Sequence, residues 1–287
     1  MMRRRRSSGG RSEEGISCGM DIGGLDKSRC WVLLNTPSAM AKHRFYLPAD
    51  RWDPEPLALD GEEAHHCLDV MRCRAGDRVV VFNGLGAEAE AEITAVSRGS
   101  VSLSTRLVVT TPRPPVTITL AQAVPKGKNM DLIIQKATEL GVSRLVPLLS
   151  ERTVVQLDGE DLEKKRQKWQ RVAIEACKQC GQNWVPEVTA PASVEALARQ
   201  VKDAIRLIAA IGSESRPLKT LLAERAQSGE VPPSAATVMI GPEGDFTPAE
   251  ISIALTQGFL PLSLGPLILR SETAAIYALS IIGHELG

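Results

Sequence analysis

The stretch TVMIGPEGDFTPAE, residues 237–250, decides the fold class. It begins with an apolar, β-prone run, Thr237–Ile240, and continues with glycine and proline. It ends in Thr247-Pro248-Ala249-Glu250, where threonine suits the N-cap of a helix, proline its first position and glutamate its third. This order predicts a strand, a glycine-rich loop and a helix that begins with a capping box.

The same strand-to-helix order recurs on both sides of this stretch. Apolar runs that favour strands occupy Val116–Val124, Val142–Leu149, Leu207–Ile211 and Leu260–Leu264, and helical patterns occupy Asp131–Leu140 and Leu162–Gly181. Such alternation predicts an α/β domain with a mostly parallel sheet over residues 116–287. Ligands of open parallel sheets bind beyond the carboxyl ends of the strands. We therefore expect the site in the loops that follow these runs.

A different pattern precedes this domain. Residues 42–111 contain short alternating strands, with Asn83-Gly84 as a hairpin signal, and Gly61–Met71 reads as one short helix. This pattern predicts a small β-barrel-like module. Thr111-Pro112-Arg113-Pro114-Pro115 follows, and three prolines cannot continue a helix or a central strand. Residues 112–115 are therefore expected to be a stiff linker between two domains.

Residues 1–41 show no helical or strand period. They begin with the basic run Arg3–Arg6, followed by serines and glycines, and we expect a disordered extension or a start codon assigned too early, before Met40. A targeting peptide is an alternative that Glu13 and Glu14 weaken, because such peptides are poor in acids. A basic RNA-binding arm is the other alternative.

Composition excludes several classes of protein. Lys+Arg and Asp+Glu are both 34, so the chain is not a polybasic nucleic-acid binder. The longest apolar stretches fall short of the ~18 residues that span a bilayer, so no membrane partner is expected. The six cysteines include one C-x-x-C pair, Cys177 and Cys180, without a second pair at zinc-site spacing. We therefore expect no metal, and a reducing cytoplasm as the compartment.

Two glycine-proline loops carry the best candidate site. Gly241-Pro242-Glu243-Gly244 follows one strand, and Gly265-Pro266 follows the next. Glycine lets the backbone approach a ligand, and Ser271 is expected to cap the last helix, whose free N–H groups suit an anionic group. Dinucleotide-binding and P-loop glycine patterns are absent. A site built mainly from backbone suits a ligand rich in hydrogen-bonding groups, such as a nucleoside.

These loops also carry a resemblance to a known family. IGPEGDF (240–246) and LSLGPLILRSETAAI (262–276) resemble the signature of the SPOUT methyltransferases. About 245 residues, 43–287, resemble the bacterial 16S ribosomal RNA uracil-N3-methyltransferase family in collinear order. Supporting stretches are HRFYLP (43–48), HHCLDVMRCRAGDRVVVFNG (65–84), AVPKGKNMDLIIQKATELGVSRLVPLLSERTVV (123–155) and KWQRVAIEACKQCGQNWVPEV (168–188).

The resemblance implies a fold and a function. It implies a PUA-like barrel that docks RNA, followed by an α/β SPOUT domain with a parallel sheet and a deep trefoil knot. It also implies S-adenosylmethionine as cofactor, a homodimer, and methylation of N3 of a uridine in 16S ribosomal RNA or the small ribosomal subunit. A ribose 2′-O-methyltransferase and a non-catalytic, RNA-binding ribosome assembly factor remain as alternatives.

The loops and the resemblance together mark candidate residues. Uracil N3 carries a proton, so Arg270 is expected to stabilise the uracil anion, with Glu243 or Glu272 as proton acceptor. Candidates for cofactor binding are Ile211, Gly212, Ile240, Gly241, Pro242, Glu243, Gly244, Leu264, Gly265, Ile268, Leu269 and Thr273. Candidates for RNA binding are Arg44, His66, Arg72, Lys126, Lys128 and Arg152.

Three stretches depart from the family pattern, at four positions. Asp245 stands where members often have glycine, and Leu267 where they often have arginine. Lys178 and Gln182 stand where members often have glutamate and arginine. The loop glycines and Arg270 are retained, so we expect cofactor binding to be retained. From the resemblance, we expect the arginine absent at Leu267 to cost a substrate or dimer contact.

Overall fold

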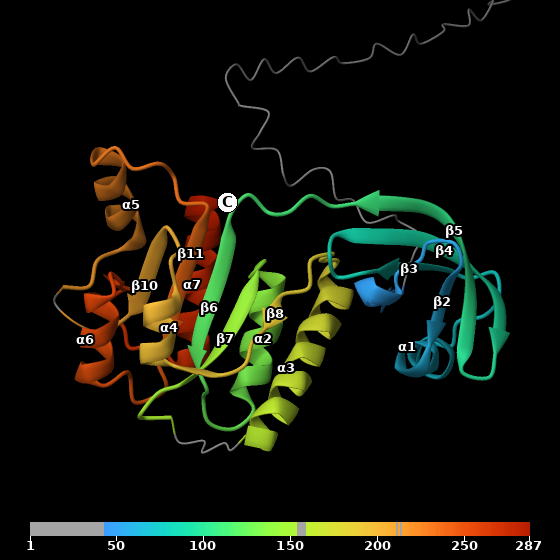
Figure 1. The fold of residues 1–287 in the computed structure, drawn as a ribbon, viewed down its shortest axis with the longest axis horizontal. Helices are drawn as coiled ribbons and strands as arrows, with labels where there is room; N and C mark the ends of the chain where they lie inside the picture. Colours follow the sequence, from blue (N-terminus) through green and yellow to red (C-terminus); the bar gives the residue numbers. More distant parts are fainter. Residues whose placement is uncertain (1–42, 154–158, 211, 213) are drawn as a thin grey trace, which may run out of the picture. The chain divides into compact units, whose positions relative to one another are not determined.

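A parallel sheet forms the centre of the larger domain (Figure 1). The computed structural model describes residues 43–287 except 154–158, 211 and 213, so the expected extension over residues 1–41 lies outside the described residues. The strands are β6 (Thr117–Ala123), β7 (Arg144–Leu149), β8 (Glu187–Val188), β9 (Ala192–Ser193), β10 (Ile205–Ala209), β11 (Ala235–Ile240) and β12 (Leu260–Leu262). Their order is β12-β10-β11-β6-β7-β8, with β9 also on β7, and every pairing is parallel.

Helices cover both faces of this sheet, because neighbouring residues along a strand point to opposite faces and are apolar on both. Leu120 of β6 contributes to one core and the next residue, Ala121, to the other. The first core includes residues of α2 (Asn129–Glu139), α3 (Gly159–Cys180), α5 (Leu218–Gln227) and α7 (Ser271–Leu286). The second core includes residues of α4 (Val194–Gln200) and α6 (Pro248–Thr256). This is the α/β architecture that the alternation predicts.

Local signals place several element ends correctly. Thr247 and Glu250 form the predicted capping box at the start of α6, with both reciprocal hydrogen bonds present. Gly141 has a φ of 79° one residue past the C-cap of α2, a left-handed position that glycine adopts easily. In the smaller domain, Gly61–Met71 is α1 (Gly61–His65) followed by a π-helical turn, His66–Val70.

The smaller domain is a curled mixed sheet. It contains β1 (Arg44–Tyr46), β2 (Leu57–Asp60), β3 (Arg78–Phe82), β4 (Ala87–Ser97) and β5 (Ser100–Thr110) in the order β1-β3-β4-β5-β2. Strand β1 is parallel to β3 and the other pairs are antiparallel. Along β4, Ala89, Ala91 and Ile93 are buried in one core. The alternation of β4 therefore points one apolar face of the strand into this core.

The structure confirms the predicted fold class: a parallel-sheet α/β domain preceded by a small β-domain. The trefoil knot stays a prediction. The described residues of both domains belong to one compact unit, in which α3 of the larger domain packs against β1 of the smaller one. No helix in the described part of the chain is both long and apolar enough to cross a bilayer.

Candidate functional site

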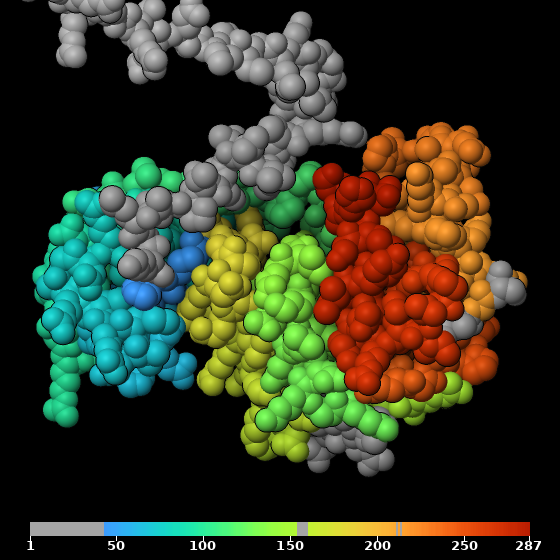
Figure 2. Space-filling model, turned by 180° about the vertical axis from the view of Figure 1, so that it is seen from behind, coloured from blue at the N-terminus to red at the C-terminus, as the bar shows by residue number. Residues whose placement is uncertain are grey.

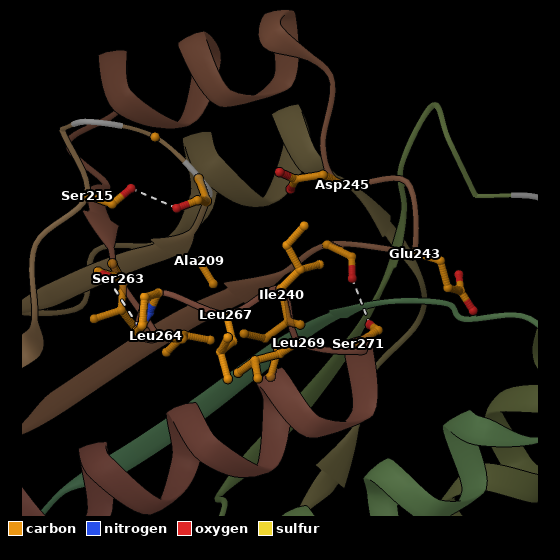
Figure 3. A pocket seen from close by; sticks show the side chains of 18 of the residues that line it. Ala209, Ser215, Ile240, Glu243, Asp245, Ser263, Leu264, Leu267, Leu269 and Ser271 are labelled. Carbon is orange, nitrogen blue, oxygen red and sulfur yellow. Dashed lines mark hydrogen bonds between the residues drawn. The ribbon is translucent and has the colours of Figure 1, made fainter.

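Three strands end at one edge of the sheet and enclose a cleft of about 290 Å³ (Figure 3). Its walls come from the loops that follow β10, β11 and β12, and from the first turn of α7. The lining residues are Ala209, Ala210, Gly212, Ser215, Ile240, Gly241, Pro242, Glu243, Asp245, Leu262, Ser263, Leu264, Gly265, Pro266, Leu267, Ile268, Leu269, Ser271 and Ala274. The cleft therefore lies where the strand-end rule places a ligand.

The cleft contains most of the predicted cofactor residues. Among the predicted set, Gly212, Ile240, Gly241, Pro242, Glu243, Leu264, Gly265, Ile268 and Leu269 line it. Gly244 and Thr273 are exposed next to it and are not among the lining residues, and Ile211 lies outside the described residues. Their roles as cofactor ligands stay predictions. Sequence reasoning missed Ala209, Ser215 and Ser263, whose strand-end positions were the available signal.

The loop after β11 is folded tightly upon itself. A Cβ at Gly241 would lie 3.1 Å from Oδ1 of Asp245 and 3.3 Å from the backbone N of Phe246. Asp245 has a φ of 61°, and its Oδ1 accepts a hydrogen bond of 2.8 Å from the Phe246 N–H. Gly241 is thus needed first for the packing of the loop itself. Asp245 takes the left-handed position where family members often have glycine, which aspartate tolerates better than most residues.

The loop after β12 is more open. Gly265 has a φ of 101°, and no described atom lies within 4 Å of the position a Cβ would take. Leu267 and Ile268, which follow, are exposed although both line the cleft. An apolar wall that solvent reaches is suited to cover a bound ligand.

A buried chain of hydrogen bonds joins the two loops to β6. The Gln122 side chain donates from Nε2 to Oγ of Ser271 at 2.9 Å, and this hydroxyl donates to the Gly241 carbonyl oxygen at 2.7 Å. Figure 3 shows the second bond at the floor of the cleft. The expectation that Ser271 caps α7 is wrong. Arg270 is the N-cap residue, and Ser271 begins the helix with its hydroxyl committed to a distant loop.

The three catalytic candidates take different positions. Glu243 lies at the rim of the cleft with its carboxylate turned away from Leu264, and its Oε1 accepts a 3.0 Å bond from the Lys126 N–H (Figure 3). Glu272 accepts a 3.4 Å bond from Asn129 and does not line the cleft. Arg270 is exposed directly before α7, and its guanidinium has no partner among the described residues. Their catalytic roles stay predictions.

The RNA-binding candidates fall into two groups. Lys126, Lys128 and Arg72 are exposed, and His66 is half-buried with its ring edge-on to Phe45. A second group is engaged within the protein. This second group contains Arg152, which donates to the Gly244 carbonyl at 2.6 Å, and Arg44, whose side chain is 16% exposed and bonds Glu88 and Asn183.

The C-x-x-C pair lies at the end of α3. Burial is the largest cause that raises the pKa of the Cys177 thiol, to about 12, and Cys180 adds to the effect. Burial also raises the pKa of Cys180, although that residue is exposed by its surface area. Both thiols therefore keep their protons at neutral pH, which makes them poor nucleophiles.

Comparison with known proteins identifies the family. Residues 112–283 match the RNA methyltransferase domain family, and residues 59–105 match the RNA methyltransferase PUA domain. The chain belongs to this family of RNA methyltransferases, as its resemblance in the sequence implied. The small β-domain is accordingly of the PUA type.

Relatives and solved structures agree with this assignment. The ribosomal RNA small subunit methyltransferase E of Bacillus subtilis is 34% identical over 230 residues, covering 80% of this chain and 90% of the relative. A methyltransferase of Legionella pneumophila, solved with bound SAM, superposes with a TM-score of 0.76 at 37% identity, covering 84% of this chain and 97% of that one. The ribosomal RNA small subunit methyltransferase E of Neisseria gonorrhoeae, solved with S-adenosyl methionine, gives 0.73 at 31% identity, with 85% and 98% covered.

Proposed function

We propose that this chain transfers a methyl group from S-adenosylmethionine to N3 of a uridine in small-subunit ribosomal RNA. The observation that carries the proposal is the cleft of about 290 Å³ at the ends of β10, β11 and β12. Two relatives solved with S-adenosylmethionine and the ribosomal RNA methyltransferase named above support it.

The residues of the cleft fit such a cofactor. Backbone at Gly241 and Gly265 offers N–H and C=O groups to an adenosine, while Leu264, Leu267 and Leu269 give an apolar wall. Ligand sites of this kind combine an apolar lining with a few placed polar groups. The bound cofactor supplies an electrophilic methyl group.

The protein's own residues then have to activate the uracil. N3 of a neutral uracil is a poor nucleophile, so its proton must leave or its anion must be stabilised. Arg270, exposed at the N-cap of α7, can place a planar cation on uracil oxygens. Glu243 lines the cleft and Glu272 does not, so Glu243 is the better placed proton acceptor.

RNA docking is assigned to exposed basic residues of both domains. Arg72 of the PUA-type domain and Lys126 and Lys128 beside the cleft are exposed and suit phosphate contacts. Arg44 is left out of this surface because Glu88 and Asn183 engage its guanidinium. The near-neutral charge of the whole chain means that these local contacts have to position the RNA.

We also propose a homodimer that uses α2 and α7. The two helices pack side by side, and Figure 2 shows them on one face of the molecule. Leu132 of α2 is 42% exposed and Tyr277 of α7 is 46% exposed. Large apolar side chains on neighbouring helices favour an interface with a second copy, which would bury them.

The test is methylation followed by nucleoside analysis. Small ribosomal subunits from a strain without this activity are incubated with the protein and S-adenosylmethionine, and the RNA is digested and analysed by mass spectrometry. The proposal predicts 3-methyluridine. A ribose-methylated nucleoside would replace it with the 2′-O alternative, and RNA binding without any methylated product would favour the non-catalytic assembly factor.

A further inference from the structure

Residues 183–185 join the larger domain to the PUA-type domain. This segment lies between α3 and β8 and runs beside residues 83–86, the loop that connects β3 to β4. The Gly86 N–H donates to the Asn183 carbonyl at 3.0 Å, and the Val185 N–H donates to the Gly84 carbonyl at 3.0 Å. The segment thus pairs with the β3–β4 loop through backbone on both sides of an antiparallel bridge between Leu85 and Trp184.

The Asn183 side chain reinforces this pairing. Asn183 is buried, with only 5% of its surface exposed. Its Oδ1 accepts a 2.7 Å hydrogen bond from Arg44 of β1, and its Nδ2 donates a 2.9 Å bond to Oγ1 of Thr111, the residue before the linker. One buried amide therefore bonds both the first strand of the PUA-type domain and the end of that domain at the linker. A buried polar group with all of these partners is costly to remove.

The Trp184 side chain also contacts the linker. Its Nε1–H lies 3.0 Å from the Thr111 carbonyl oxygen and 3.1 Å from that of Pro112, and the guanidinium of Arg113 lies 4.6 Å from its ring centre. Gly86 has to be glycine here, because a Cβ would come within 2.6 Å of the Trp184 ring. Indole, glycine and linker therefore fit together without free space.

A second contact between the domains involves Lys178, in the last turn of α3. The Lys178 side chain, 7% exposed, donates to Glu63 of α1 at 2.5 Å and to Glu175 at 2.7 Å. Oε2 of Glu63 in turn accepts a bond from the Tyr46 N–H at 3.1 Å.

We propose that Asn183 is a positioning residue, which fixes the PUA-type domain at a set distance from the cleft and thereby brings bound RNA to the methyl donor. This inference rests on the proposed function for its substrate. Without the Asn183 side chain, the linker, Trp184 and the Lys178–Glu63 pair still join the two domains, but the buried amide that bonds Arg44 and Thr111 together no longer fixes their orientation. Productive binding requires RNA contacts on both domains at the same time.

The expected effect falls on RNA binding and not on the chemical step. If loss of the amide leaves the two domains correctly oriented about a tenth of the time, the apparent KM for RNA rises about 10-fold. The kcat stays nearly unchanged, because saturating RNA restores the same complex. Affinity for S-adenosylmethionine stays unchanged, because the cleft is built from the loops after β10, β11 and β12.

The test compares Asn183→Leu with Asn183→Asp. Leucine has a similar volume and removes both side-chain bonds. Aspartate keeps an acceptor for Arg44, and the Thr111 hydroxyl can reverse and donate to it. Gln167→Leu is the matched control, since that amide bonds Glu163 four residues earlier on the same helix, at 3.0 Å. Thr111→Val, which removes one of the two bonds, replaces Asn183→Leu if that variant does not fold.

Two readouts decide the proposal. Hydrogen exchange at the Gly86 and Val185 amides is expected to become faster in Asn183→Leu, while the β4–β5 and β6–β11 ladders stay protected. The KM for RNA is expected to rise in the same variant and to return near the wild-type value in Asn183→Asp. Unchanged exchange would contradict the proposal that Asn183 holds the two domains together. Faster exchange with an unchanged KM would contradict its role in positioning RNA. If the wild type proves inactive, the proposed function fails, and exchange together with RNA affinity from filter binding still decides this inference.

Discussion

Ser271→Ala tests the hydrogen bonds beneath the cleft. The buried hydroxyl accepts from Gln122 and donates to the Gly241 carbonyl, so alanine leaves a buried amide and a partly buried carbonyl each without one partner. Gln122 keeps its bond to the Ala123 carbonyl, whereas its Oε1 has no hydrogen-bond partner among the described residues. A buried group left unsatisfied costs about 1–3 kcal/mol. Because one of the two groups keeps a bond, we expect a total loss of about 2 kcal/mol.

This loss converts into a measurable shift. For a protein of this size, each kcal/mol lowers the melting temperature by about 2–4 °C, so Ser271→Ala should melt about 4–8 °C lower. Affinity for S-adenosylmethionine should also fall, since Gly241 lines the cleft. The matched control is Ser280→Ala on the exposed face of α7, where the hydroxyl bonds the Ile276 carbonyl of its own helix at 2.8 Å. Calorimetry and titration of both variants would refute the reasoning if Ser271→Ala behaved like Ser280→Ala.

Three further predictions concern chemistry, stability and assembly. Arg270→Ala should lower the methyl-transfer rate about 10²-fold with little change in cofactor affinity, and Arg270→Lys should restore little of that rate. A parallel loss of cofactor binding in a titration would mean a structural role for Arg270 instead. Burial raises the pKa of the Cys177 thiol from 9.0 to about 12, so the native state keeps a proton that the unfolded chain loses, and stability falls as pH rises from 9 towards 12. Cys177→Ala should make that fall shallower in denaturant titrations across this range; an identical slope would contradict the assignment. Tyr277→Asp should convert a dimer to a monomer in light scattering, whereas Val231→Asp, at another exposed apolar residue, should not; a wild-type monomer would refute the dimer.

Local patterns predicted the fold well. The capping box at Thr247 and the glycine after α2 depend on residues a few positions apart, so the sequence contains the whole signal. The strand-end rule likewise predicted the position of the cleft, because the carboxyl ends of parallel strands share one edge.

Contacts between distant residues were not predictable in this way. Ser271 has the residue type and position of a helix cap, but its partner Gln122 lies 149 residues earlier. Arg44 has the charge of an RNA contact, whereas its partners lie on β4 and after α3. Asn183 carries no local pattern at all. In each case the tertiary structure determines the hydrogen-bond partner, and residues near in sequence do not indicate it.

The most direct test of the cofactor site is a calorimetric titration of S-adenosylmethionine into the wild type and into Gly265→Val. Gly265 lines the cleft with a φ of 101°, and no described atom lies within 4 Å of the position of its Cβ. Valine there strains the loop and projects into the space assigned to the cofactor. The account predicts binding by the wild type and none by a folded Gly265→Val. Equal affinity in both proteins would place the cofactor elsewhere and contradict the account.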